Sequence, residues 1–147
     1  VLYQVEHSRD GKSFATRRVI AIQKGEQIFN MACSFQVPES GFDHQTPMPE
    51  APAAESLQDD RARWREVFAD LPDVAERWSA EEPIEIRSVE PVNIRDPKPS
   101  QNGQKVWLRA RRDLGDGVAI NQALLAYASD YSLLGTAMRP HGVPSRE

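Results

Sequence analysis

The chain has 147 residues, 39% of them hydrophobic and 27% charged, a balance typical of one soluble globular domain. Its formal net charge of −4 excludes a general nucleic-acid binder, which needs a basic face to displace counterions. The single cysteine, Cys33, excludes an internal disulfide and a cysteine-based zinc site, so we expect a reducing, cytoplasmic location. No apolar run approaches the ~20 residues of a membrane span, and the first residues do not resemble a signal peptide.

The first 37 residues predict a meander of three antiparallel strands. Asp10-Gly11 supplies a hairpin turn that tolerates positive φ, and Lys24-Gly25 supplies a second turn. Between these turns, residues 14–23 are rich in Val, Ile and Thr. The third strand is predicted over residues 27–37, and its apolar face consists of Phe29, Met31, Cys33 and Phe35.

Residues 38–54 contain four prolines, Pro38, Pro47, Pro49 and Pro52, which predicts a linker rather than a regular element. A short surface helix is predicted over residues 57–71, with Ser56 as its N-cap and with Trp64, Phe68 and Leu71 on one face. A second β region starts at Pro83. It contains Ile84 and Ile86, and then a half-buried strand over residues 105–111, in which Val106, Leu108 and Ala110 alternate with polar or aromatic residues.

Residues 119–138 predict one helix that is apolar on nearly all sides and therefore buried, with strands as its only available cover. Asp130 lies within this apolar stretch, on the same face as Tyr127 and Leu134. A buried carboxylate needs hydrogen-bond partners or serves as a base, so Asp130 is a catalytic candidate. The alternative is that it faces solvent or joins a structural network. Arg139 and His141 close the helix, and Gly142 is expected to adopt the left-handed cap.

Several blocks of the sequence together resemble the type II (TesB) acyl-CoA thioesterase family. The clearest block is residues 124–131, Leu-Leu-Ala-Tyr-Ala-Ser-Asp-Tyr, followed by Arg-Pro-His-Gly at residues 139–142. Further blocks in the order of the family are residues 9–14, 16–19, 21–23, 28–29, 34–36, 44–45, 48–49, 85–87 and 106–110, with Pro52.

This resemblance implies an α+β, double-hotdog fold in incomplete form, in which an antiparallel sheet wraps a central helix. Residues 1–37 correspond to the last strands of a first hotdog. Residues 38–82 correspond to a linker with a short surface helix, and residues 83–147 to the first strands and central helix of a second hotdog. The chain would then be a piece of a longer protein, a truncated product or a permuted single hotdog.

The resemblance also implies hydrolysis of fatty acyl-CoA to a free fatty acid and coenzyme A. The catalytic Asp of the family matches Asp130, whereas its Thr and Gln partners, on later strands, have no matching positions. Tyr127 and Tyr131 are candidate substrate-binding residues, although core packing explains them as well. We expect no cofactor and no metal, since the three histidines lie far apart. Homo-oligomers are expected by analogy with the family.

Two further interpretations remain open. A non-catalytic hotdog that binds acyl groups or provides an assembly surface is the alternative function. Five basic side chains are either phosphate ligands for coenzyme A or part of a solvated strand face, namely Arg17, Arg18, Arg109, Arg111 and Arg112. Ser129 is a poor candidate nucleophile, because it has neither a strand-turn-helix elbow nor a neighbouring His.

Overall fold

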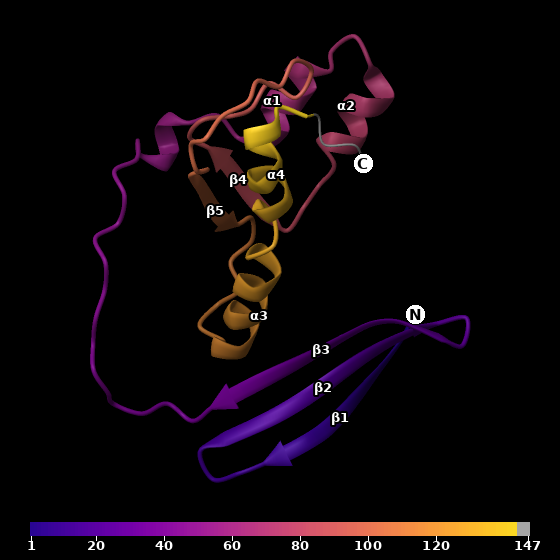
Figure 1. Cartoon of the computed structure of the whole chain (residues 1–147), viewed down its shortest axis with the longest axis vertical. Coiled ribbons are helices and arrows are strands. Elements are labelled where there is room, and N and C mark those ends of the chain that lie inside the picture. Colours follow the sequence, from indigo (N-terminus) through magenta and orange to yellow (C-terminus); the bar gives the residue numbers. More distant parts are fainter. Residues whose placement is uncertain (144–147) are drawn as a thin grey trace. The chain divides into compact units, whose positions relative to one another are not determined.

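The computed structural model describes residues 1–143, which form two compact units, Val1–Pro47 and the part of the chain from Met48 onward. The elements of both units are drawn in Figure 1. None of the helices in the described part is both long and apolar enough to cross a bilayer. The predicted domain segment 83–147 ends in four residues, 144–147, that lie outside the described residues.

The first unit is a three-stranded antiparallel meander made of β1 (Leu2–Asp10), β2 (Phe14–Gln23) and β3 (Glu26–Gln36). The predicted three-strand meander is therefore confirmed. Lys24 and Gly25 have φ values of 53° and 84°, the left-handed pair that matches hairpin twist. Gly11 closes the other hairpin, where a Cβ would lie only 2.9 Å from the carbonyl oxygen of Phe14.

The register of this sheet places apolar side chains from all three strands on one face. Val5 pairs with Val19, which pairs with Met31, and Tyr3 pairs with Ala21, which pairs with Phe29. Only Ala21, in the central strand, is buried. Tyr3, Val5, Phe29 and Met31 on the same face are exposed, so no other element of the first unit covers this face.

The second unit begins with a helical corner. A short 3-10 turn, η1 (Ala54–Ser56), precedes α1 (Asp60–Val67) and α2 (Pro72–Trp78). The predicted N-cap Ser56 is wrong: Asp59 caps α1 by accepting a hydrogen bond from the backbone N–H of Arg61 at 3.0 Å. The helix predicted over residues 57–71 corresponds to α1, which is shorter. α2 was not predicted from the sequence. It starts at Pro72, a position where the missing N–H of proline costs nothing.

Aromatic packing holds α1 and α2 together. The ring centroids of Trp64 and Trp78 are 5.1 Å apart, and Phe68 lies 5.9 Å from Trp78 and 6.2 Å from Trp64. Phe68 is buried. Edge and tilted contacts of this kind add stability beyond the area that they bury.

The rest of the unit contains a two-stranded sheet and the C-terminal helices. β4 (Ile84–Ser88) pairs with β5 (Val106–Ala110) in antiparallel register, Ile84 opposite Ala110 and Ile86 opposite Leu108. α3 (Val118–Ala128), α4 (Leu133–Met138) and a 3-10 turn, η2 (Arg139–His141), follow. Gly142 ends η2 with φ 57°, which confirms the predicted left-handed cap.

The predicted continuous helix over residues 119–138 is wrong, because it is interrupted at residues 129–132. Ser129 donates its hydroxyl to the carbonyl oxygen of Ala126 at 2.7 Å, and Thr136 donates to that of Ser132 at 2.6 Å. Short polar side chains that bond the backbone compete with regular helix geometry. Ser129, Asp130 and Ser132, together with Gly135, therefore weaken the helix at this place.

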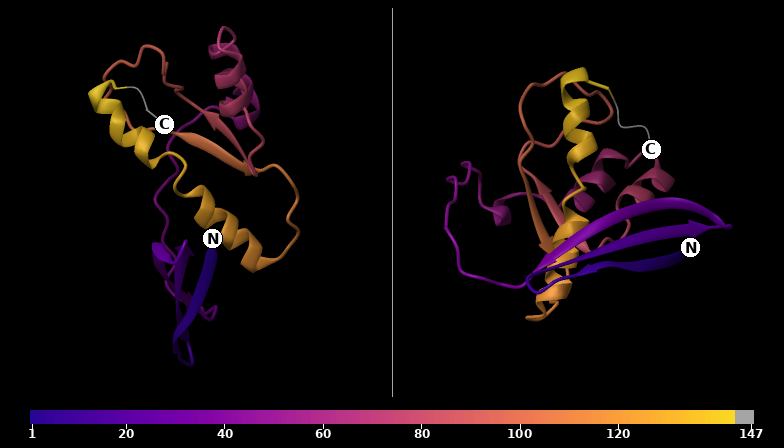
Figure 2. Two further views of the ribbon diagram at one scale, coloured as in Figure 1. Left: turned by 90° about the vertical axis from the view of Figure 1, so that its right-hand side faces the viewer. Right: turned by 60° about the horizontal axis from the view of Figure 1, so that its bottom comes forward.

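The expectation that this helix is buried is also wrong for the described residues. Leu125 is 70% exposed, Tyr127 51% and Leu133 62%. Figures 1 and 2 show α3 extending beyond the end of β4 and β5. Two strands spaced ~4.8 Å apart cannot surround a helix that is roughly 10 Å wide, so most of the apolar surface of α3 remains uncovered.

Candidate functional site

Asp130 lies at the junction between α3 and α4 and is exposed. Its backbone carbonyl accepts a bond from the N–H of Leu133 at 3.5 Å. Its neighbours Ser129 and Tyr131 form side-chain hydrogen bonds, whereas its own carboxylate forms none with residues 1–143. The prediction of a carboxylate buried in an apolar layer is therefore wrong here. Both carboxylate oxygens are instead free to accept bonds.

Tyr127 and Tyr131 form a small polar cluster one turn apart on the chain. Their hydroxyls lie 3.1 Å from each other, and the hydroxyl of Tyr131 donates to Oε2 of Glu82 at 3.1 Å. The two rings meet edge to face with centroids 5.4 Å apart. The structure thus brings both sequence-predicted tyrosines together, with Glu82 as a partner that the sequence pattern gave no reason to select.

Burial raises the pKa of the Tyr131 hydroxyl, and its bonds to Tyr127 and Glu82 raise the pKa further. Both partners interact less favourably with a negatively charged phenolate than with the neutral phenol, so they disfavour loss of the proton. Tyr131 therefore stays protonated at neutral pH. It acts as a hydrogen-bond donor and acceptor, not as a base.

A cavity of about 690 Å³ opens on the apolar face of β4 and β5. Its wall includes Ile86 and Val106 from the strands, Trp64 and Trp78 from the helical corner, and residues of α4. Tyr131 and Glu82 also line it, whereas Tyr127 and Asp130 do not. Of the three predicted site residues, only Tyr131 therefore contacts this cavity.

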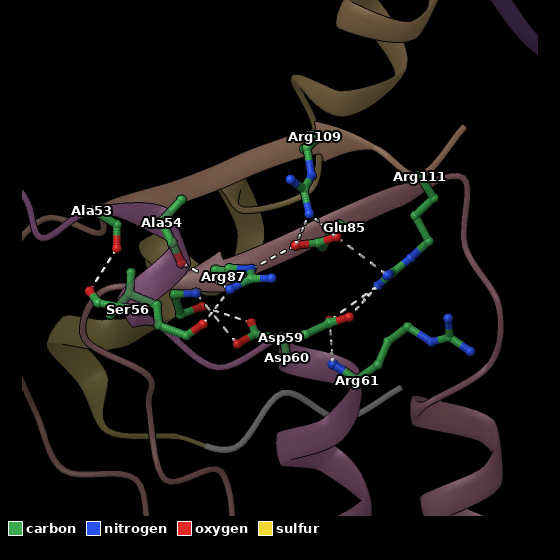
Figure 3. A network of polar contacts seen from close by, with 12 residues as sticks. Ala53, Ala54, Ser56, Asp59, Asp60, Arg61, Glu85, Arg87, Arg109 and Arg111 are labelled. Carbon is green, nitrogen blue, oxygen red and sulfur yellow. Dashed lines mark hydrogen bonds and ion pairs between the residues drawn. The ribbon is translucent and has the colours of Figure 1, made fainter. Parts of the chain in front are cut away.

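The opposite face of β4 and β5 carries a charged network, shown in Figure 3. Arg109 donates to both oxygens of Glu85 at 2.8 and 3.0 Å, and Arg87 donates to Glu85 at 2.6 Å. At the edge of this network Arg111, which also lines the cavity, pairs with Asp59 at 2.9 Å. Hydrogen bonds from Arg109, followed by those from Arg87, hold the pKa of Glu85 below its ordinary value.

All five basic residues considered as coenzyme A ligands are paired with acids. Arg109 and Arg111 belong to the network, and the other pairs are Arg17 with Asp10, Arg18 with Glu6 and Arg112 with Glu81. A guanidinium already bound to a carboxylate has fewer donors left for phosphate. These pairs favour the interpretation of the arginines as parts of structural surfaces.

Sequence reasoning missed the burial of Arg139. This residue was expected to meet the exposed end of a helix dipole, but its side chain is only 7% exposed and lines the cavity. No pattern in the sequence identifies it, because its cover comes from residues far away in the chain. Among residues 1–143, no group of three or more His, Cys, Asp or Glu side chains has an arrangement that could hold a metal ion.

Comparison with known proteins relates the chain to one family. Residues 79–147 match the family model described as acyl-CoA thioesterase. Acyl-CoA thioesterase 2 of Haemophilus influenzae is 35% identical over 142 residues, which cover 96% of this chain and 50% of that protein. Acyl-coenzyme A thioesterase 8 of Homo sapiens is 38% identical over 151 residues, covering 96% and 47% respectively.

Solved structures give the same relation. The crystal structure of an acyl-CoA thioesterase II from Mycobacterium marinum matches with a TM-score of 0.64 and 38% identity, covering 95% of this chain and 47% of that one. A tesB protein from Mycobacterium avium subsp. paratuberculosis matches with a TM-score of 0.68 and 23% identity, covering 96% and 46%. The second match shows the fold alone.

The sequence-based resemblance to type II acyl-CoA thioesterases and the predicted fold, an incomplete double hotdog, are confirmed by these matches. The chain spans about half the length of the curated relatives that it matches.

Proposed function

We propose that this chain is the part of an acyl-CoA thioesterase that contributes the catalytic aspartate. The strongest support is that 96% of the chain aligns with proteins named acyl-CoA thioesterases, at 35–38% sequence identity. The family model covers residues 79–147 and so includes Asp130. The two curated relatives described above are both named as acyl-CoA thioesterases, so they give no support to a non-catalytic acyl-binding or assembly module.

In the proposed mechanism Asp130 orients a water molecule and accepts its proton as the water attacks the thioester carbonyl carbon. The bond from carbon to the coenzyme A sulfur then breaks, and the products are a carboxylic acid and a thiol. General-base assistance of this kind is worth about 10²–10⁴ in rate. Because residues 1–143 leave the carboxylate oxygens unbonded, Asp130 can accept bonds from the water and from Thr and Gln partners supplied outside the described residues.

Tyr131 and Tyr127 are proposed to contact the acyl group. Their hydroxyls are held by Glu82 and by each other, which leaves the ring faces to contact aliphatic carbon. The sequence spacing would put both tyrosines on the helical face of Asp130. In the structure α3 ends at Ala128, between the two tyrosines. We expect them to influence affinity for the acyl chain more than the rate of the chemical step.

The remaining assignments follow the same proposal. Residues 1–37 are assigned to the end of a first hotdog, 38–82 to the linker, and 83–147 to the start of a second. The substrate is a fatty acyl-CoA in the cytoplasm, and the protein is a homo-oligomer active in fatty acid metabolism. Cys33 is a free thiol, which agrees with a reducing compartment.

The decisive experiment is Asp130→Asn in the full protein, with thiol release from a fatty acyl-CoA as the measurement. We expect kcat to fall by about 10²–10⁴, because an amide cannot accept the proton of water. Asp116→Asn is the matched control, since Asp116 is an exposed aspartate in the turn before α3. Circular dichroism should be unchanged in both variants. Wild-type turnover in Asp130→Asn would eliminate the assignment of the base.

A further inference from the structure

We propose that the cavity beside β4 and β5 binds the carboxylate of an aliphatic acid through Arg139. Asp130 does not line this cavity, whereas Tyr131, which we propose to contact the acyl group, does. The inference rests on the proposed function and deepens it, because an aliphatic acid is the product of the proposed hydrolysis and Arg139 is the residue that would bind its carboxylate.

The first observation is that the hydrogen-bonding capacity of Arg139 is poorly used. Its side chain is only 7% exposed, and Nη1 donates to the carbonyl oxygen of Glu90 at 3.2 Å. The buried Nε, however, has no partner among residues 1–143. A guanidinium carries five N–H donors, and a buried donor without a partner is costly.

The second observation is that the positive charge of Arg139 is weakly compensated. Its nearest acid is Glu90, whose Oε2 lies 3.8 Å from Nη2 and whose side chain is 58% exposed. A buried charge is stabilised only by close, well-hydrogen-bonded partners. An anion entering the cavity would supply a partner of this kind and would stabilise the folded chain.

The wall of the cavity indicates which anion fits. Apolar side chains from both strands and from α4 surround the space, among them Ile86, Val106, Leu134 and Met138. Two of the other cations in the wall are already neutralised by acids, Arg63 by Asp60 at 3.3 Å and Arg111 by Asp59 at 2.9 Å. Lys98 also pairs with Asp96, and Arg61 donates to the carbonyl oxygen of Ser79. Arg139 is the only buried cation of the wall among the described residues, and a buried cation beside apolar side chains fits one negative charge joined to an aliphatic chain.

The position of Arg139 within the cavity indicates how the ligand would be oriented. Arg139 is held in place by its backbone, whose carbonyl accepts bonds from Ser100 at 2.9 Å and Gly142 at 3.3 Å. A Cβ at Gly142 would lie 2.6 Å from Cδ of Pro99, so the loop closes tightly over this end. The carboxylate head would lie at this end, and the chain would extend over the strands.

Binding of decanoate and of decanol to the full protein, measured by titration calorimetry, tests the proposal. We expect decanol to bind at least tenfold more weakly, because it lacks the charge that Arg139 recognises. The second measurement is the fluorescence of Trp64 and Trp78, which line the cavity and should be quenched when decanoate binds. Equal affinities for the acid and the alcohol would overturn the proposal, as would binding of coenzyme A without binding of decanoate.

Variants separate this site from its surroundings. Arg139→Gln should reduce decanoate affinity to that of decanol and leave decanol unchanged, whereas Arg95→Gln, at an exposed arginine outside the cavity wall, should change neither. If Arg139→Gln does not fold, the comparison of acid with alcohol in the wild type still decides. Asp130→Asn should bind decanoate normally, so a failure of the proposed hydrolysis would be distinguishable from a failure of this site.

Discussion

The two sheets of this protein have the same alternating sequence pattern but different surroundings. Along β1–β3, alternation gathers Val5, Val19 and Met31 on one face, and that face is exposed apart from its central strand. Along β4 and β5, alternation gathers Ile84 and Ile86 on one face, where Ile84 is 2% exposed. Alternation determines which side chains share a face, whereas cover by other elements determines whether that face stabilises the fold.

The sharpest test of this comparison replaces one phenylalanine in each unit. Phe68→Ala removes a buried ring from the aromatic corner and should lower the free energy of unfolding by about 3 kcal/mol. Phe29→Ala removes a half-exposed ring from the uncovered face and should cost less than about 1 kcal/mol. Urea denaturation of the 147-residue chain measures both. Equal losses would show that the face of β1–β3 is covered in solution.

The covered unit also depends on the cap of α1. Asp59 accepts the N–H of Arg61 and forms an ion pair with Arg111, so Asp59→Ala should lower stability by about 1–2 kcal/mol. Asp73, in the first turn of α2, is not a cap residue. Asp73→Ala should therefore change the denaturation midpoint much less. If the two variants lose the same stability, the capping role of Asp59 is excluded.

The charged side of β4 and β5 predicts a specific pH dependence. Because Arg109 and Arg87 hold the pKa of Glu85 below its ordinary value of 4.5, the stabilisation is complete above pH 4.5. It is lost as the pH falls through the lower native pKa. At pH 7, Glu85→Gln should cost about 1 kcal/mol after allowance for solvent screening. Denaturation at pH 7 and pH 3 should show this difference shrinking in acid, and a constant difference would contradict it.

The smallest effect is expected at an exposed ion pair. Arg95 donates two bonds to Asp70 at 2.6 and 2.7 Å, and both side chains are substantially exposed. Surface pairs of this type contribute little because water and salt screen them. Arg95→Gln should leave the denaturation midpoint within experimental error at low and high salt. A large loss would mean that the contact of Arg95 with the ring of Phe68 matters to the aromatic corner.

Much of the strand structure follows from the sequence by itself. Local alternation and turn chemistry determine the turns at Asp10-Gly11 and Lys24-Gly25, the three strands that these turns connect, and the short strand β5. The left-handed cap at Gly142 is equally local. The block around Asp130 carries the resemblance to thioesterases in the sequence alone.

The aromatic corner, the helix break and the site depend on contacts that no local pattern contains. Asp130 is exposed and Arg139 is buried, the reverse of what helix periodicity and the helix dipole indicate. The physical reason is that burial depends on which distant segments supply cover. Two strands leave most of the apolar surface of α3 uncovered, while the carbonyl of Glu90 and the loop before β5 enclose Arg139. Only the tertiary structure decides these two positions.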